Sequence, residues 1–299
     1  MIIPEKLKIG DKIGIVSTAR KISLVELKDA ILTLESWGLK VVLGKNLFKE
    51  NKQFSGTIEQ RTADLQNMIN DVEVKAILCA RGGYGTVQII DEIDFSNLKN
   101  NSKWIIGYSD VTVLHSHLHK LGFASLHATM PINFKENSRA SLKSLEDSLF
   151  GRKNIIECKN HILNRLGEVE AQIVGGNLSI LYSLLGSESD IKTQGKILFI
   201  EDVDEYLYHI DRMMISFHRN QKLAKLKGLI IGGMSKMNDN ETSFGESAEI
   251  IISKYIKRYD YPICFGFPAG HINDNRCIQL GLRSSLRITE KGAILVQDQ

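Results

Sequence analysis

The first half of the chain alternates short apolar runs typical of β-strands with amphipathic patterns typical of helices. This alternation limits the possible fold strongly. A helix between two strands returns the chain to the end of the sheet where the first strand began, so that the two strands can pair in parallel. We therefore predict an α/β domain over residues 1–150, with a parallel sheet of the Rossmann or flavodoxin type. The expected strands are Lys12–Ala19, Lys40–Leu43, Val74–Ala80 and Lys103–Ser109.

Capping boxes mark the start of two expected helices in this domain. Ser23–Glu26 and Thr57–Gln60 have the spacing at which each side chain can bond to the other residue's backbone N–H. The first helix should end at Gly38 and the second near Val72. After a glycine-rich turn, we expect a further helix over Thr86–Ile93.

The pattern loosens between residues 151 and 167, which we interpret as an interdomain linker. Residues 168–299 then predict a smaller, β-rich α/β domain. Its expected helices are Leu178–Leu185 and Tyr206–Phe217. Its expected strands are Glu168–Val174, Lys196–Ile200, Gly228–Ile231, Pro262–Phe267, Arg276–Leu280, Ser285–Ile288 and Ala293–Val296.

Composition excludes several classes of protein. The 38 basic and 35 acidic residues are evenly mixed, which disfavours a nucleic-acid or membrane surface and favours a small-molecule partner. There is no secretory leader pattern and no apolar run of roughly 18 residues, so we expect a cytoplasmic protein. Cys79, Cys158, Cys264 and Cys277 lie far apart without a C-x-x-C pair, which predicts reduced, inert thiols and neither a disulfide framework nor a zinc site.

The segment 104–110 ends an apolar run at Gly107-Tyr108-Ser109-Asp110 and passes directly into a helical pattern. A nucleophilic serine is presented on such a sharp strand-to-helix turn, beside the backbone N–H groups of the new helix. Asp110 could also cap that helix. The alternative is an ordinary strand-helix turn, since Val111 replaces the second glycine of Gly-x-Ser-x-Gly.

A serine nucleophile needs a base and an orienting carboxylate. His271 follows Gly270 in a loop between strands, from which a side chain can reach a cleft, although a solvated loop histidine remains the alternative. Glu201 ends an apolar strand where site residues often lie, whereas Asp202 and the acidic residues after it are explained as caps of the next helix.

Two other motifs could mark sites of a different kind. His115 and His119 share one helix face, but the glutamate of the H-E-x-x-H zinc motif is absent. The turn 81–85 could be a nucleotide phosphate loop, yet Gln88 stands where a third small residue is expected. We prefer a role for this turn at the carboxyl ends of the strands, where Gly82 and Gly83 could let a backbone N–H approach an oxyanion, together with the N–H of Asp110.

Taken together, these segments resemble the LD-carboxypeptidase family of serine peptidases over nearly the whole chain. The resemblance depends on the order and spacing of several short motifs rather than on any one of them. They are Gly10-Asp11-Lys12-Ile13, Arg81-Gly82-Gly83-Tyr84-Gly85, Gly107-Tyr108-Ser109-Asp110, Gly175-Gly176-Asn177-Leu178, Glu201-Asp202, Asp211-Arg212, Gly270-His271 and Leu280-Gly281.

The resemblance implies a triad of Ser109 as nucleophile, His271 as general base and Glu201 as orienting carboxylate, with an oxyanion hole from the main chain of Gly83 and Asp110. It implies a cytoplasmic homodimer that needs no metal or cofactor. The implied reaction releases the terminal D-alanine of a murein tetrapeptide during cell-wall recycling. A carboxypeptidase must also bind the free carboxylate of its substrate, for which Arg81 is a candidate, unless Arg81 only braces the glycine-rich turn.

Some residues depart from the family pattern. Residues 272–275 and 278–279 differ from the glycine- and proline-bearing versions common in the family, which affects substrate detail more than the triad. Two alternatives remain open. One is a peptidase of the same fold acting on a microcin-type aminoacyl-nucleotide peptide, although residues 202–270 hold no tryptophan for base stacking. The other is a non-enzymatic α/β protein that binds a small ligand.

Overall fold

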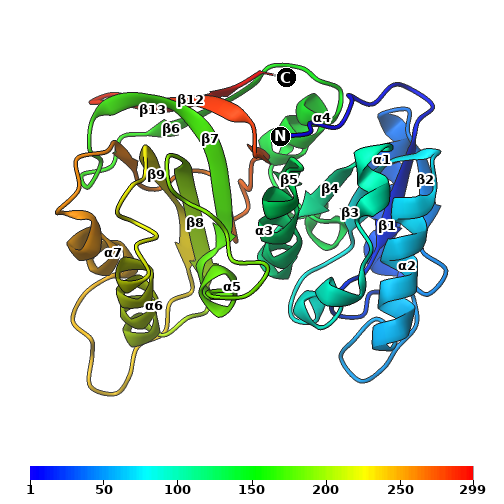
Figure 1. Ribbon diagram of the computed structural model, residues 1–299, viewed down its shortest axis with the longest axis horizontal. Coiled ribbons are helices and arrows are strands. Elements are labelled where there is room, and N and C mark those ends of the chain that lie inside the picture. Colours follow the sequence, from blue (N-terminus) through cyan, green and yellow to red (C-terminus); the bar gives the residue numbers. More distant parts are fainter. Residues whose placement is uncertain (299) are drawn as a thin grey trace.

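A computed structural model, which describes residues 1–298, contains two α/β domains side by side (Figure 1). The first sheet has the strand order β11-β5-β4-β3-β1-β2, and its strands β1 to β5 are parallel. The order 2-1-3-4-5 is that of flavodoxin-like folds and confirms the predicted class. The strands are β1 (Lys12–Val16), β2 (Lys40–Leu43), β3 (Val74–Cys79), β4 (Trp104–Gly107), β5 (Ser125–His127) and the antiparallel β11 (Ile278–Leu280).

Apolar side chains on both faces of this sheet are buried. Along β1, Ile13 and Ile15 belong to the core cluster on one face, whereas Val16 belongs to the cluster on the other. Burial on both faces explains why these strands read as nearly continuous apolar runs. The helices are α1 (Leu24–Ser36), α2 (Ile58–Asn70), α3 (Thr112–Leu121) and α4 (Arg139–Leu149).

Both predicted capping boxes are formed, at Ser23 with Glu26 and at Thr57 with Gln60. The helix expected over Thr86–Ile93 is wrong, because this segment contains only two 3₁₀ turns, Thr86–Gln88 and Ile90–Glu92. The β-branched residues in this segment disfavour an α-helix. The Thr86 N–H at its start donates to the Asp110 side chain at 2.8 Å.

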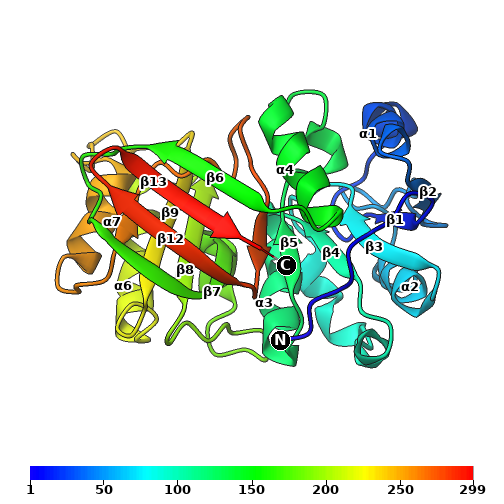
Figure 2. The same cartoon turned by 90° about the horizontal axis from the view of Figure 1, so that it is seen from above.

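The second sheet has the order β10-β9-β8-β7-β12-β13-β6 (Figure 2). Its strands β7 to β10 are parallel, and β7, β12, β13 and β6 pair antiparallel. The strands are β6 (Asn154–Lys159), β7 (Gly167–Asn177), β8 (Ile197–Val203), β9 (Gly228–Ser235), β10 (Ile263–Cys264), β12 (Arg283–Thr289) and β13 (Gly292–Gln297). The helices are α5 (Leu178–Ser183), α6 (Leu207–Arg219) and α7 (Ala248–Ile256).

The segment expected as a linker, residues 151–167, is largely structural. It contains β6, which pairs with β13, and Arg165, which forms a bridge to Ile263 at the other edge of the sheet. The predicted strand Arg276–Leu280 belongs to the first sheet as β11 rather than to the second. The chain therefore crosses between the domains more than once, and no single linker segment separates their sheets.

The domains meet where α3 packs against the end of β7. The Asn177 N–H donates to the Thr112 hydroxyl at 3.0 Å, and a Cβ on Gly176 would lie 2.5 Å from the same oxygen. One turn further along α3, the Ser116 hydroxyl donates to the Ser189 carbonyl. Within residues 1–298, no helix has the length and apolar character needed to cross a membrane.

Candidate active site

Ser109 lies on a strained turn between β4 and α3. Its φ is +62°, in the left-handed region that non-glycine residues rarely adopt. Gly107, with φ +157°, leaves room for Val111, whose nearest methyl would lie 2.9 Å from an added Cβ. The predicted sharp presentation of this serine is therefore confirmed.

Asp110 does not cap the helix that follows it, contrary to our expectation. Its carboxylate is buried and instead ties the sharp turn of residues 107–110, called the elbow below, to the glycine-rich turn by accepting the Thr86 N–H. Burial raises the pKa of Asp110, and the hydrogen bonds from Thr86 and the charges of Arg61 and Arg20 oppose that rise. The residue after the nucleophile thus joins two loops of the first domain.

His115 supports the elbow from inside the first domain. Its Nε2 lies 2.8 Å from the Gly107 carbonyl oxygen, and its Nδ1 lies 2.8 Å from the Ser125 hydroxyl. Burial lowers its pKa to about 3, so the ring is neutral near pH 7. Because both ring nitrogens are engaged, His115 is not free to ligate a metal together with His119.

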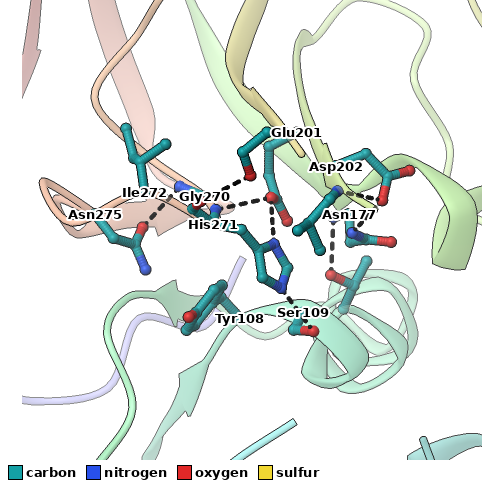
Figure 3. A network of polar contacts seen from close by, with 12 residues as sticks. Tyr108, Ser109, Asn177, Glu201, Asp202, Gly270, His271, Ile272 and Asn275 are labelled. Atoms are coloured by element: carbon teal, nitrogen blue, oxygen red, sulfur yellow. Dashed lines mark hydrogen bonds and ion pairs between the residues drawn. The ribbon is translucent and has the colours of Figure 1, made fainter. Parts of the chain in front are cut away.

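Three side chains from the two domains form a hydrogen-bonded series (Figure 3). The Nε2 of His271 lies 3.0 Å from the Ser109 hydroxyl, and its Nδ1 lies 2.7 Å from Glu201 Oε2. The same carboxylate oxygen accepts the His271 backbone N–H at 3.1 Å. Such a series can pass a proton from the hydroxyl to the imidazole while the carboxylate fixes the ring.

The charges in this series support one another. Burial alone would lower the pKa of His271, but the charge and hydrogen bond of Glu201 outweigh it and raise that pKa above its usual range. Glu201 is 0% exposed, which would raise its pKa, yet the charge and hydrogen bonds of His271 hold it below the usual value. Glu201 is therefore ionised, and His271 is a stronger base than a free imidazole.

The loop that carries His271 is fixed by contacts with both domains. Gly270 has φ +103° and donates its N–H to the Asn275 side chain at 2.8 Å. A Cβ at Gly270 would lie only 2.6 Å from Glu201 Oε2, so a larger residue would displace the carboxylate. Asn137 of the first domain donates to the Asn273 carbonyl at 2.9 Å. Residues 273 and 275 thus brace the histidine loop.

The glycine-rich turn lies directly beside the elbow. We expected this because the turn and the elbow follow β3 and β4, and the carboxyl ends of parallel strands lie on the same side of the sheet. A Cβ on Gly82 would be 2.9 Å from the Ser109 Cβ and 3.4 Å from the Asp110 nitrogen. Only glycine allows this close approach of two main chains. The turn and the N–H of Asp110 therefore border the same space next to the serine hydroxyl.

Two arginines flank this turn, and they differ in their contacts. Arg81 donates to the Lys21 carbonyl at 3.0 Å and so braces the turn. Arg20, which our sequence analysis missed, lies against Gly83, where an added Cβ would be 2.6 Å from its Cδ. Within residues 1–298, no carboxylate forms an ion pair with Arg20.

Asp202 has a different role from the one predicted. It accepts hydrogen bonds from the Asn177 side chain at 2.8 Å and from the Ser179 N–H at 2.9 Å, both at the start of α5. Burial and the neighbouring Glu201 charge raise its pKa to about 7. It therefore fixes α5 against the end of β8 and does not cap α6.

Aromatic packing around His271 was also missed by the sequence analysis. The Tyr108 ring lies 4.8 Å from the His271 ring, and the Tyr108 hydroxyl donates to Asn133 at 3.0 Å. Behind them, His127 is fully buried and packs edge-on against Phe199. Tyr108 and His271 lie in the motifs named above, but no motif marks Asn133, His127 or Phe199, because their packing depends on strands from both domains meeting.

An α/β protein in which a serine, an imidazole and a carboxylate are hydrogen-bonded in series belongs to the class of serine hydrolases by fold and site. The comparisons narrow this class. The LD-carboxypeptidase N-terminal domain matches residues 13–128, and the LD-carboxypeptidase C-terminal domain matches residues 170–286. The chain belongs to the LD-carboxypeptidase family and is a serine-type enzyme.

Individual relatives agree with this assignment. The probable murein peptide carboxypeptidase of Bacillus subtilis is 34% identical over 300 residues, covering 98% of this chain and 93% of its own. The murein tetrapeptide carboxypeptidase of Pseudomonas aeruginosa is 27% identical and covers 91% and 92%.

Solved structures show the same architecture. The crystal structure of muramoyltetrapeptide carboxypeptidase from Oxalobacter formigenes superposes with a TM-score of 0.88 at 26% identity, covering 96% of this chain and 99% of that one. The microcin C7 self immunity protein MccF, in complex with aspartyl sulfamoyl adenosine, has a TM-score of 0.89 at 22% identity, with coverage of 100% and 99%. At that identity the second likeness shows the fold alone.

Proposed function

We propose that this enzyme removes the terminal D-alanine from a murein tetrapeptide in cell-wall recycling, acting in the cytoplasm as a homodimer. The observation that carries the proposal is the series Ser109–His271–Glu201, with distances of 3.0 and 2.7 Å, inside a chain related to murein peptide carboxypeptidases. Family membership also argues against the alternative of a non-enzymatic binding protein.

In the proposed mechanism, His271 Nε2 takes the proton of Ser109 as the hydroxyl oxygen attacks the scissile carbonyl carbon. The backbone N–H groups of Gly83 and Asp110 hold the oxyanion of the tetrahedral intermediate. His271 then gives the proton to the amine of the leaving D-amino acid. Water, deprotonated by the same ring, releases the acyl group from Ser109.

We further propose that a guanidinium beside the glycine-rich turn binds the free carboxylate of the substrate. Arg81 was the expected residue, but its bond to the Lys21 carbonyl occupies part of its guanidinium. Arg20 is exposed, lies against Gly83 and pairs with no carboxylate in residues 1–298, so its charge is available for the substrate. A charge-assisted bond of this kind contributes about 1.5–3 kcal/mol to binding.

The microcin-type substrate remains a second candidate because of the fold shared with MccF. Tyr206 and Tyr208, 43% and 39% exposed, follow the end of β8 and offer aromatic surface that the sequence analysis did not consider. Their ring centroids are 5.6 Å apart and their planes are tilted by 38°, and Arg212 stacks on Tyr208. The murein peptide is preferred because the relatives of higher identity are a probable murein peptide carboxypeptidase and a murein tetrapeptide carboxypeptidase.

The test is to incubate the purified enzyme with a murein tetrapeptide and to follow the loss of one alanine by mass spectrometry. Parallel samples contain the same peptide ending in L-alanine, the C-terminally amidated peptide, and an aminoacyl-sulfamoyl nucleotide. Ser109→Ala should be inactive, and Ser253→Ala on the surface of α7 serves as the matched control. Cleavage of the nucleotide but not of the tetrapeptide would favour the second candidate, and equal activity of Ser109→Ala would contradict both.

The arginine assignment is tested in the same assay. Arg20→Gln should raise KM for the free tetrapeptide by about tenfold to hundredfold with little change in kcat, since the charge acts in binding. Arg81→Gln should have the smaller effect. An unchanged KM in Arg20→Gln would remove this residue from the proposal.

A further inference from the structure

Two cysteines on opposite edges of the second sheet lie beside each other. β6 and β10 are the first and last strands in the order of this sheet, yet Cys158 Sγ on β6 lies 3.4 Å from Cys264 Sγ on β10. The sheet therefore curls until its two edges approach, with β6, β13 and β12 crossing over β8 and β9 (Figure 2). The segment after β6 closes the same gap, because Arg165 and Ile263 exchange backbone hydrogen bonds.

The two thiols have different surroundings. Cys264 is fully buried, whereas Cys158 is partly exposed and lines a surface cavity of about 360 Å³ together with Arg276 and Pro268. The hydrogen bond between the thiols lowers the pKa of Cys158 against the effect of its partial burial, and Arg276 adds to the lowering. The same hydrogen bond and burial raise the pKa of Cys264.

We propose that Cys158 and Cys264 form a redox-active dithiol, in which Cys158 reacts with a peroxide and Cys264 resolves the product into a disulfide that joins β6 to β10. This goes beyond our expectation of four inert thiols and does not depend on the substrate of the enzyme.

The reaction balances without any group other than the peroxide. The Cys158 thiolate attacks one oxygen of hydrogen peroxide, so an S–O bond forms, the O–O bond breaks, and the second oxygen leaves as water after protonation. The Cys264 sulfur then attacks the sulfenic sulfur, so the S–S bond forms and the S–O bond breaks, with the oxygen leaving as water. Two thiols are oxidised by two electrons, and one peroxide is reduced to two waters.

The position of the pair connects this chemistry with the active site. Cys264 ends β10, and seven residues later the same segment places His271 against Glu201. Within this segment, the Phe267 N–H donates to the Ile231 carbonyl, and the Pro268 carbonyl accepts the N–H of Arg276. A disulfide would therefore link the base of the histidine loop covalently to the far edge of the sheet.

The other two cysteines are internal controls. Cys79 and Cys277 are fully buried, and burial raises the pKa of each to about 12. Neither has a sulfur partner among the residues that the structure describes. They should stay reduced under conditions that oxidise the pair.

The experiment treats the folded, fully reduced enzyme with hydrogen peroxide, blocks the remaining thiols, and maps the peptides without reduction. We expect a peptide linking residues 158 and 264, two hydrogens lighter than its parts, which dithiothreitol separates. In Cys264→Ser, dimedone should trap a sulfenic acid at Cys158, and in Cys158→Ser no linked peptide should form. Labelling of Cys158 should be at least about tenfold faster than that of Cys277.

The result that would overturn the proposal is equally specific. Absence of the linked peptide while Cys158 proceeds to sulfinic acid would exclude Cys264 as the resolving thiol. Equal labelling of all four cysteines would show that this pair has no special reactivity. Circular dichroism of each variant establishes that the sheet is still folded when the thiols are tested.

Discussion

The two halves of the active site are built in different ways. Ser109 is positioned by its own neighbourhood in the chain, through a strand end, a glycine and a left-handed residue within residues 104–112. His271 is positioned by Glu201 from β8 and Asn137 from the first domain, both distant in the chain, and by Asn275 within its own loop. A nucleophile held by backbone conformation therefore faces a base held by long-range side-chain contacts.

Because of this difference, the two halves of the active site should respond to mutation for different reasons. Changes on the serine side should act on backbone strain and on the nucleophile itself. Changes on the histidine side should act through the ion pair with Glu201 and the anchoring of the loop. Substitutions on the two sides should therefore separate these two modes of positioning.

Glu201→Gln should lower kcat by about 10⁴, because an amide neither stabilises the imidazolium nor enforces the required tautomer. In the wild-type enzyme, the raised pKa of His271 places the acidic limb of kcat/KM above pH 6.5. Without the Glu201 charge, burial dominates and the pKa of His271 falls, so the limb should move to lower pH. A pH–rate profile measures this shift, and an unmoved limb would contradict the pairing of His271 with Glu201.

Gly270→Ala should lower kcat/KM by about 10²-fold. The added Cβ would lie only 2.6 Å from Glu201 Oε2 and would therefore push this carboxylate out of its position. Gly186→Ala is the matched control. Gly186 also has a positive φ, of +79°, but nothing lies within 4 Å of its added Cβ. Steady-state kinetics of the two variants separate the contact with Glu201 from backbone strain alone, and equal losses would show that the contact has no role.

Ser109→Gly should be more stable than Ser109→Ala by about 1 kcal/mol, since glycine adopts φ +62° without the steric cost that alanine carries. The opposite order is expected at position 271, where φ is not positive: His271→Gly should be less stable than His271→Ala by about 0.5–1 kcal/mol. Urea denaturation of the four variants measures both differences. The same order at both positions would remove the distinction between the two halves.

The serine side was the more predictable from sequence because its signals are local. The apolar strand, Gly107 and the helical pattern after Ser109 are adjacent in the chain, and they give the turn that the structure contains. The strand order of the first sheet also followed the expected flavodoxin-like class. Local patterns were sufficient wherever one segment determines its own conformation.

Features that depend on distant contacts were not predictable in this way. The polar segment 151–167 was expected as a linker, although its strand β6 is stabilised by β13, more than 130 residues later. Asp110 and Asp202 were interpreted as caps of the helices that follow them, whereas their partners are Thr86 and Asn177. Arg20 carries no motif, and only the fold places it beside Gly83.

The measurement that tests the central claim most directly is a double-mutant comparison of tetrapeptide hydrolysis. If Ser109 and His271 act as one proton-transfer unit, Ser109→Ala and His271→Ala should each lower kcat by about 10⁶, and the double variant should be no slower than either single variant within about tenfold. A His271→Ala variant that keeps activity within about 10²-fold of wild type, or a double variant at least about 10²-fold slower than both single variants, would contradict the account.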